Sequence, residues 1–250
     1  MPHHLMIYTE SIAQNVEVDV DALADGIVTI SNNHFQPLER LKLAFACAAS
    51  ANVARVRVST PSIQRYTSPF IRPLSNAVGW GVPQRVQDFR NLGFSLPALE
   101  EITVTALQTG AGAERVWVGV GAMIQDRPAP AGPVYTLRGA STTAAVANVI
   151  TPISVTWQNQ LPAGQYAIVG CQVQSATGLF FRLNIQGFAY RPGGASLTTI
   201  GSDPHELFLP NGLGEWGRFS NTAMPSLEVL CNAADALHEI YLQVVPLMSA

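Results

Sequence analysis

A proline-rich segment close to the midpoint is the feature that most constrains how this 250-residue chain can fold. Three prolines fall within residues 128–133. Such a segment cannot lie inside a sheet, because proline has no amide hydrogen for the ladder and stiffens the chain. The flanking stretches are each about 120 residues long, a common size for one domain. We therefore predict domains over residues 1–126 and 134–250, joined by a linker at residues 127–133.

The two halves carry similar short motifs in the same order. An apolar run around Cys47 matches a run around Cys171, which lies 124 residues further along the chain. The later matches are Gly79-Trp80-Gly81 with Gly214-Glu215-Trp216-Gly217, Leu96–Glu100 with Met224–Glu228, and Arg115–Val118 with Glu239–Leu242. Their offset drifts between 124 and 136 residues, as loop insertions in two copies of one domain would cause. We interpret the chain as a duplication.

Alternation of apolar and polar residues dominates both halves and predicts half-buried β-strands. The clearest runs are residues 16–20, 54–58, 102–106, 116–120, 170–174, 181–185 and 239–243. Between them lie most of the 20 glycines and 17 prolines, which are typical of turns that join short strands. We expect an all-β fold with two short helices, at residues 68–76 and 202–208, each opened by a capping serine and an early proline.

Charge is scarce, since only 12% of residues are charged and the net charge is −3. Arginines and the single lysine, Lys42, form no run. This argues against a protein that coats nucleic acid, which needs excess basic residues to displace counterions. No apolar stretch is long enough to predict a membrane helix, and no secretory signal is visible at the first residues. Three cysteines without a CxxC pair predict buried thiols in a reducing compartment.

Tandem β-sandwiches joined by a short linker, with a short helix in each half and no catalytic motif, resemble the double jelly-roll major capsid proteins. That family includes the coat proteins of tectiviruses and corticoviruses, and the size of this chain is closest to small corticovirus-like members. The resemblance spans about residues 10–247 and rests on the repeat order described above. It implies an all-β fold of two tandem eight-stranded jelly rolls.

The resemblance also implies a function. It predicts a structural capsid protein, not an enzyme, that forms homotrimers of pseudo-hexameric outline, and these tile an icosahedral shell. Its partners would be further copies of the chain and a penton protein at the vertices, without direct binding of nucleic acid, and members of the family often enclose an internal membrane. The location implied is the virion, assembled in the host cytoplasm. No cofactor is expected, apart from a possible structural cation.

The distribution of charge fits such a subunit independently of the resemblance. Residues 1–126 hold 20 charged side chains and residues 127–250 hold 11. Because the cores of protein interfaces are depleted in Lys, Glu and Asp, we expect the second half to supply much of the contact between subunits.

Few residues suggest a chemical site. We interpret Cys47, Cys171, Trp80 and Trp216 as structural residues, because the cysteines lie in strand-like apolar runs and the tryptophans match across the repeat. Glu100 and Glu228 also match, which suggests a shared structural role. For a metal ion the weak candidates are Asp19, Asp21 and Asp25, which do not form an EF-hand because Leu23 and Ile30 occupy ligand positions.

Three alternatives remain open at this point. A two-domain cupin would need a His-x-His pair, which is absent; His3-His4 are consistent with a mobile tail and His34 with a loop. A carbohydrate-binding tandem sandwich would use exposed aromatic platforms such as Trp80 and Trp216. A sandwich hydrolase would need convergent polar residues; no Gly-x-Ser-x-Gly motif occurs, and the adjacent Glu100 and Glu101 would point to opposite faces of a strand.

Overall fold

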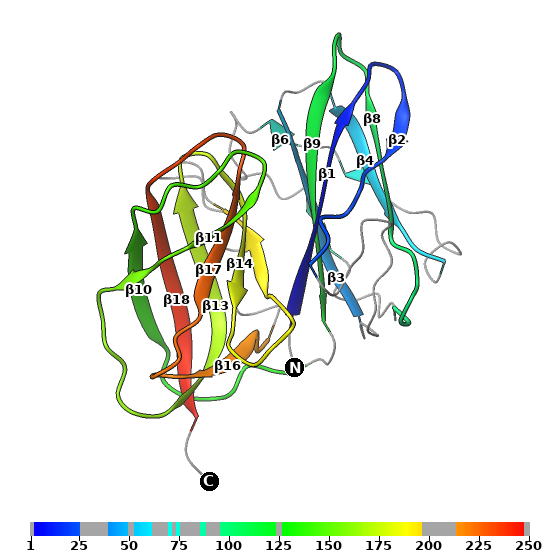
Figure 1. Cartoon of the computed structure of the whole chain (residues 1–250). Coiled ribbons are helices and arrows are strands. Elements are labelled where there is room, and N and C mark those ends of the chain that lie inside the picture. The colour runs from blue at the N-terminus through cyan, green and yellow to red at the C-terminus, as the bar shows by residue number, and fades with distance from the viewer. Residues whose placement is uncertain are drawn as a thin grey trace. The chain divides into compact units, whose positions relative to one another are not determined.

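A computed structural model describes residues 3–25, 40–49, 53–61, 70–71, 74–75, 86–88, 96–123, 127–196 and 214–247. The regular structure in these ranges is β-strand without a helix, which confirms the prediction of an all-β chain. Accordingly, no helix in them has the length and apolar character needed to cross a membrane. The chain divides into two units: an amino-terminal unit, Leu5–Gln125, and a carboxy-terminal unit, Asp126–Ala250 together with Met1–His4 (Figure 1).

The amino-terminal unit consists of two sheets. In the first, the strands lie in the order β1-β9-β3, with both β6 and β7 paired to β3; in the second, the order is β2-β8-β4-β5. The strand bounds are β1 (His3–Ile12), β2 (Glu17–Asp19), β3 (Arg40–Ala48), β4 (Val53–Ser59), β5 (Phe70–Ile71), β6 (Leu74–Ser75), β7 (Val86–Asp88), β8 (Thr103–Gln108) and β9 (Glu114–Met123).

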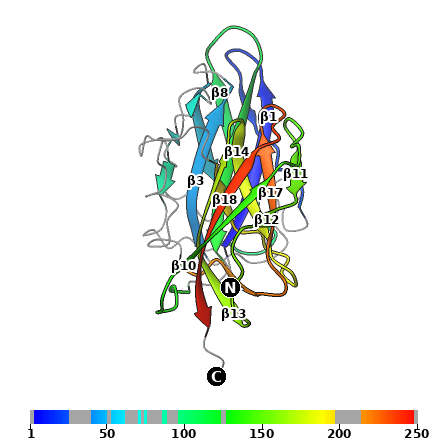
Figure 2. The same ribbon diagram turned by 90° about the vertical axis from the view of Figure 1, so that its left-hand side faces the viewer.

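The carboxy-terminal unit also consists of two sheets, ordered β12-β10-β18-β13-β16 and β11-β17-β14-β15. Its longest ladder joins β13 to β18, which lie side by side in Figure 2. The strand bounds are β10 (Tyr135–Ser141), β11 (Ile150–Ile153), β12 (Thr156–Trp157), β13 (Gln165–Ser175), β14 (Gly178–Asn184), β15 (Gly193–Ala195), β16 (Gly217–Ser220), β17 (Ser226–Cys231) and β18 (His238–Leu247).

Strand order identifies both units as jelly rolls. Leaving aside β6 and β12, the described part of each unit has eight strands in sequence. The first, eighth, third and sixth form one sheet, and the second, seventh, fourth and fifth form the other. This is the arrangement of an eight-stranded jelly roll, in which successive strands, apart from the fourth and fifth, lie in different sheets. The predicted fold class is therefore confirmed, and the identical order in both units supports the duplication.

Burial follows the predicted alternation on some strands. On β8, Val104 and Ala106 are buried while Thr103 and Thr105 are half-buried; on β18, Ile240, Leu242 and Val244 are buried. Because successive side chains point to opposite faces of a strand, these two strands each turn one apolar face into the core of their unit. Residues 116–122 of β9 and 178–183 of β14 are buried at every position, so burial does not alternate there.

Close packing explains the glycine opposite Trp157 on β12. A Cβ added to Gly139 on β10 would lie 2.5 Å from Val155 and 2.9 Å from Ile240. Glycine at this position lets the side chains of the neighbouring strands close over β10.

The sequence predicted two short helices, and the structure tests one of them. The proposed helix at residues 68–76 is wrong where this segment is described, because Phe70–Ile71 forms β5 on the edge of β4 and Leu74–Ser75 forms β6 beside β3. Pairing with a free sheet edge satisfies the backbone of these short segments, which local capping signals cannot foresee. The proposed helix at residues 202–208 lies outside the described residues.

The pairing of the strands aligns the two units differently from the short motifs matched in the sequence. Isolated bridges join Gln14 to Gln108 and Ala147 to Cys231, so Gln108 on β8 corresponds to Cys231 on β17. Counting back three residues on each strand pairs Thr105 with Glu228. The predicted correspondence of Glu100 with Glu228 is therefore wrong, because Glu100 precedes β8 whereas Glu228 lies within β17.

Cys47 and Cys171 occupy the same strand of the jelly roll but different registers. Cys47 lies opposite Trp117 on β9. An offset of 124 residues on both strands would place Cys171 opposite Tyr241, but Cys171 lies opposite Leu242 on β18. A shift of one residue turns a side chain to the other face of its sheet. If β9 and β18 keep the 124-residue offset, the two cysteines therefore face opposite sides.

Candidate functional site

The cysteines lie in positions suited to packing. Cys47, Cys171 and Cys231 are free thiols and all three are buried. Burial raises the pKa of each thiol above its ordinary value, so each remains protonated near neutral pH. A protonated, buried thiol is a poor nucleophile and packs as a small apolar group.

Trp216 is fully buried in the carboxy-terminal unit. Its ring stacks on Phe181, with 6.4 Å between centroids, and lies 5.4 Å from the ring of His3. A fully buried indole cannot serve as a platform for a sugar, so the arrangement contradicts this part of the carbohydrate-binding alternative. Trp80 lies outside the described residues.

His3 and His4 form the start of β1 and do not behave as a mobile tail. Both are buried in the carboxy-terminal unit. The backbone N–H of Arg191 donates to Nδ1 of His4 at 3.0 Å, and that of Gly193 donates to Nδ1 of His3 at 3.4 Å. These two amides lie at the edge strand β15, so the imidazoles satisfy donors that would otherwise face no partner strand. No periodic pattern of residues predicts this contact. His34 and His205 lie outside the described residues.

The acidic segment after β2 runs beside β1. The backbone N–H of Thr9 donates to the carbonyl of Asp21 at 3.0 Å, and Tyr8 is bridged to Ala22. Asp19 and Asp21 are exposed and Asp25 is half-buried. Within the described ranges, no three His, Cys, Asp or Glu side chains gather where they could hold a metal ion. A cation bound by Asp19, Asp21 and Asp25 stays a prediction without support from the geometry.

A buried ionic cluster lies on the sheet of β14 and β17. Glu228 accepts bonds from Arg182, with 3.0 Å between Nη2 and Oε2, and from Arg191, with 2.9 Å between Nη1 and Oε1. Arg182 is 2% exposed and Glu228 9% exposed at the side chain. Two guanidinium groups share one carboxylate, and a buried charge needs such pairing because it has lost its water. This cluster was missed at the sequence level, since its members lie 37 and 46 residues apart.

Most charged side chains in the described part of the carboxy-terminal unit pair with one another. Nine occur there, and seven of them belong to the Glu228 cluster, the Arg138–Glu239 pair or the Glu215–Arg218 pair. Arg138 also lies 5.8 Å from the centre of the Tyr241 ring, and the Tyr241 hydroxyl donates to Glu239 at 2.8 Å. These hydrogen bonds lower the pKa of Glu239.

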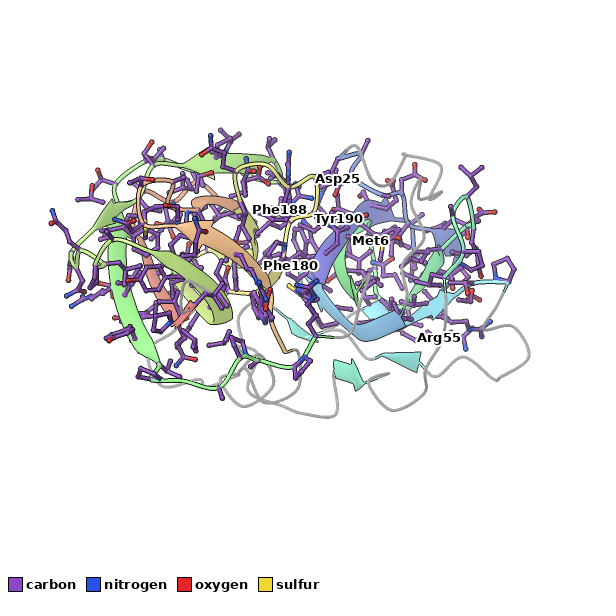
Figure 3. The ribbon with its side chains drawn as sticks, turned by 90° about the horizontal axis from the view of Figure 1, so that it is seen from below. Met6, Asp25, Arg55, Phe180, Phe188 and Tyr190 are labelled. Atoms are coloured by element: carbon purple, nitrogen blue, oxygen red, sulfur yellow. The ribbon has the colours of Figure 1, made fainter. Side chains whose placement is uncertain are left out.

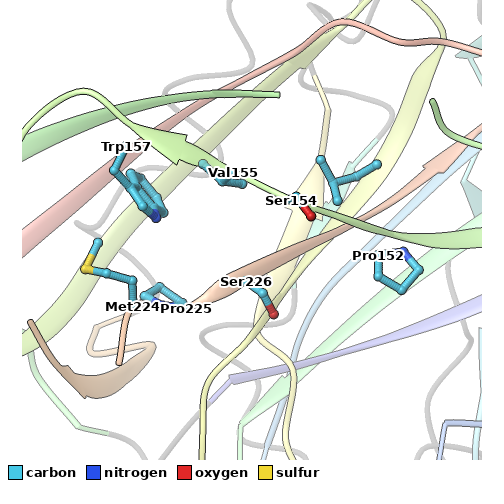
Figure 4. A pocket seen from close by; sticks show the side chains of 8 residues that line it. Pro152, Ser154, Val155, Trp157, Met224, Pro225 and Ser226 are labelled. Atoms are coloured by element: carbon cyan, nitrogen blue, oxygen red, sulfur yellow. The ribbon is translucent and has the colours of Figure 1, made fainter. Parts of the chain in front are cut away.

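One open pocket, of about 370 Å³, lies in the carboxy-terminal unit (Figure 4). Six apolar residues line it, together with Ser154 and Ser226, which supply hydroxyl groups. The six are Pro152, Ile153, Val155, Trp157, Met224 and Pro225. None of the eight lining residues titrates near neutral pH, so the lining supplies no general acid or base.

Comparison with known proteins adds little beyond the fold. No protein-family model and no curated protein sequence matches the chain. Among solved structures, the chain is similar to the major capsid protein P2 of bacteriophage PM2, at 12% identity and a TM-score of 0.25, over 99% of this chain and 98% of that one. At so low a TM-score, the assignment of the fold rests on the strand order of the two units.

Proposed function

We propose that this chain is a structural coat protein of a virus, which acts by associating with copies of itself. The observation that carries the proposal is the same jelly-roll strand order found twice in one chain. Three such chains around one axis would present six similar units, which gives the pseudo-hexameric trimer expected from the family that the sequence resembles. Trimers of that outline can tile an icosahedral shell.

The treatment of charge supports self-association. Seven of the nine charged side chains in the described part of the carboxy-terminal unit form ion pairs within the unit. An interface between copies that covers these pairs removes few unpaired charges from water, and removal of unpaired charges is a costly step in association.

The proposal extends to partners and place. The chain would form homotrimers and meet a penton protein at the vertices, in a shell of the kind that can enclose an internal membrane, without contacting nucleic acid directly. It would reside in the virion after assembly in the host cytoplasm. It would need no enzymatic activity and no cofactor, because burial of complementary surface drives assembly.

Light scattering coupled to size-exclusion chromatography tests the proposal. We expect a mass three times that of the 26.8 kDa chain at micromolar concentration. Negative-stain microscopy of the same fraction should show particles of hexagonal outline. A species that stays monomeric at all concentrations up to about 100 µM, well above the Kd of a stable oligomer, would overturn the proposed function.

A further inference from the structure

The connections that follow β1 and β8 in the amino-terminal unit, and β10, β13 and β17 in the carboxy-terminal unit, join strands of one sheet to strands of the other. We call them the tip connections. In the amino-terminal unit they are residues 13–16 and 109–113; in the carboxy-terminal unit they are residues 142–149, 176–177 and 232–237.

The tip connections of the carboxy-terminal unit are tied together by hydrogen bonds. The backbone N–H of Ala145 donates to the carbonyl of Asp235 at 2.6 Å, and that of Asn232 donates to the carbonyl of Thr177 at 3.0 Å. The Asp235 carboxylate accepts bonds from the Ser175 hydroxyl at 2.7 Å and from the backbone N–H groups of Thr177 and Leu237. These connections therefore form one ordered surface.

A smaller set of bonds orders the amino-terminal unit in a similar way. The side-chain amide of Gln108 donates to the carbonyl of Gly112 at 2.7 Å, and the carbonyl of Gln108 accepts the backbone N–H of Asn15 at 2.9 Å. The matching bond in the other unit runs from the N–H of Asn148 to the carbonyl of Cys231 at 2.7 Å.

The first tip connection ends in the same turn in both units. Asn15 and Asn148 have φ angles of 56° and 60°, and each is followed by a valine and then by the second strand of its jelly roll. Asparagine is among the few residues other than glycine that adopt this left-handed conformation readily. The backbone thus accounts for asparagine, but not for the valine.

The valines after these turns are exposed, although valine side chains are most often buried in folded proteins. Val16 is 44% exposed and Val149 is 52% exposed. In the carboxy-terminal unit, Val146 at 56% and Leu237 at 70% lie on the same connections. Apolar side chains grouped on one ordered surface indicate a contact with another molecule.

The chemistry of these connections selects the class of partner. Of their 25 residues only Asp235 is charged, and its carboxylate is occupied by internal hydrogen bonds. They carry no Lys or Arg, so they offer nothing to anionic lipid or to phosphates. They carry no Trp or Tyr, the residues that anchor a protein at a bilayer interface. A protein surface is the partner that remains.

We propose that the tip connections bind a second copy of this chain, with Val16, Val146, Val149 and Leu237 as the apolar contacts. The one charge on this surface, the Asp235 carboxylate, is held by internal hydrogen bonds, so the surface meets its own copy with little repulsion between like charges. Each chain presents this surface twice, once on each unit. The inference deepens the proposed function and rests on it.

Aspartate substitution of a tip valine tests the inference. Val149→Asp places a charge in the contact and should weaken self-association at least tenfold, and adding Val16→Asp should weaken it further. Val134→Asp is the matched control, because Val134 is 55% exposed and lies outside the tip connections. It should change the association constant less than threefold.

Sedimentation velocity over a concentration series measures the association, and thermal unfolding of each variant shows that it folds. Since Val149 is exposed, its replacement should leave the midpoint of unfolding within a few degrees of the parent. If Val149→Asp lowered the midpoint of unfolding by more than a few degrees as well as weakening self-association, the result would assign Val149 a role within the chain and overturn the inference.

The remaining outcomes separate this inference from the proposed function. If the parent chain is itself monomeric, the proposed function fails. If the parent associates and Val149→Asp associates equally well, or no worse than Val134→Asp, only the inference fails. Flotation with neutral phosphatidylcholine vesicles supplies a further measurement, and binding that Val149→Asp abolishes would assign the surface to a membrane and overturn the contact between copies.

Discussion

The two jelly rolls share their strand order, but the ion pairs on corresponding faces of their corresponding sheets differ in exposure to water. In the amino-terminal unit, Glu17 on β2 pairs with Arg55 on β4 at 3.1 Å, and both side chains are 38% exposed. Figure 3 labels Arg55. In the carboxy-terminal unit, Glu228 on β17 pairs with Arg182 on β14, and both are nearly inaccessible to water. One fold thus carries a solvated ion pair in one copy and a desolvated ion pair in the other.

The difference matters because the free energy of an ion pair depends on its exposure. An exposed pair contributes about 0–1 kcal/mol, since water screens it and two long side chains must be ordered. A buried pair has already lost its hydration, so removing one partner leaves an uncompensated charge, at a cost of about 3–5 kcal/mol. The Glu228–Arg182 pair should therefore matter more to the stability of its unit than the Glu17–Arg55 pair does.

The largest expected effect is that of Glu228→Ala. It leaves both Arg182 and Arg191 without their shared carboxylate and should lower the free energy of unfolding of the carboxy-terminal unit by about 3–5 kcal/mol. Urea unfolding followed by circular dichroism measures the change. A loss below about 1 kcal/mol would show that water reaches the cluster, and the contrast between the units would then disappear.

Protonation of Asp235 should have the next largest effect. Desolvation acts to raise its pKa, but hydrogen bonds from Ser175, Leu237 and Thr177, together with the nearby His238, lower it overall. A lowered pKa means that the stabilisation is present above the unfolded-state pKa of about 3.9 and is lost as the pH falls through the folded-state pKa.

Asp235→Asn tests this at two pH values. It should lower the stability of the carboxy-terminal unit by about 1.5–3 kcal/mol at pH 7, since bonds to a charged acceptor are lost, and by much less near pH 2. The amino-terminal unit uses the uncharged Gln108 to order its connection, so Gln108→Ala should cost the same at both pH values. An equal loss for Asp235→Asn at both pH values would contradict the assignment.

Substitution of Asn15 and of Asn148 should have similar effects on stability, because both residues adopt the left-handed conformation in the same turn of their units. Alanine at either position must adopt a left-handed conformation and should cost about 1–2 kcal/mol, whereas glycine should be nearly neutral. Urea midpoints of the four single variants measure this. If alanine were tolerated in one unit only, the two turns would not be equivalent.

The smallest expected effect is that of Glu17→Ala, which serves as the counterpart of Glu228→Ala. Removal of this half-exposed carboxylate from Arg55 should change the free energy of unfolding by about 0–1 kcal/mol, and added salt should reduce the difference further. Comparing urea midpoints with and without 0.5 M NaCl measures it. A loss as large as that of Glu228→Ala would mean that exposure does not govern these pairs.

Local patterning accounts for much of what could be foreseen. The alternation in residues 102–106 and 239–243 marks β8 and β18, and the matched runs around Cys47 and Cys171 fall on the corresponding strands β3 and β13. The match between Glu100 and Glu228 failed because short motifs tolerate a slip of several residues, whereas hydrogen-bonded register does not.

What the amino-acid sequence determined by itself is the class of fold and its duplication, because alternation and turn residues act through neighbours along the chain. Only the tertiary structure decided which charges meet and which apolar residues stay exposed. Arg182 and Glu228 are 46 residues apart and become partners through the pairing of β14 with β17. Val16 and Val149 have the same pattern as any buried valine, and their exposure depends on where the chain turns.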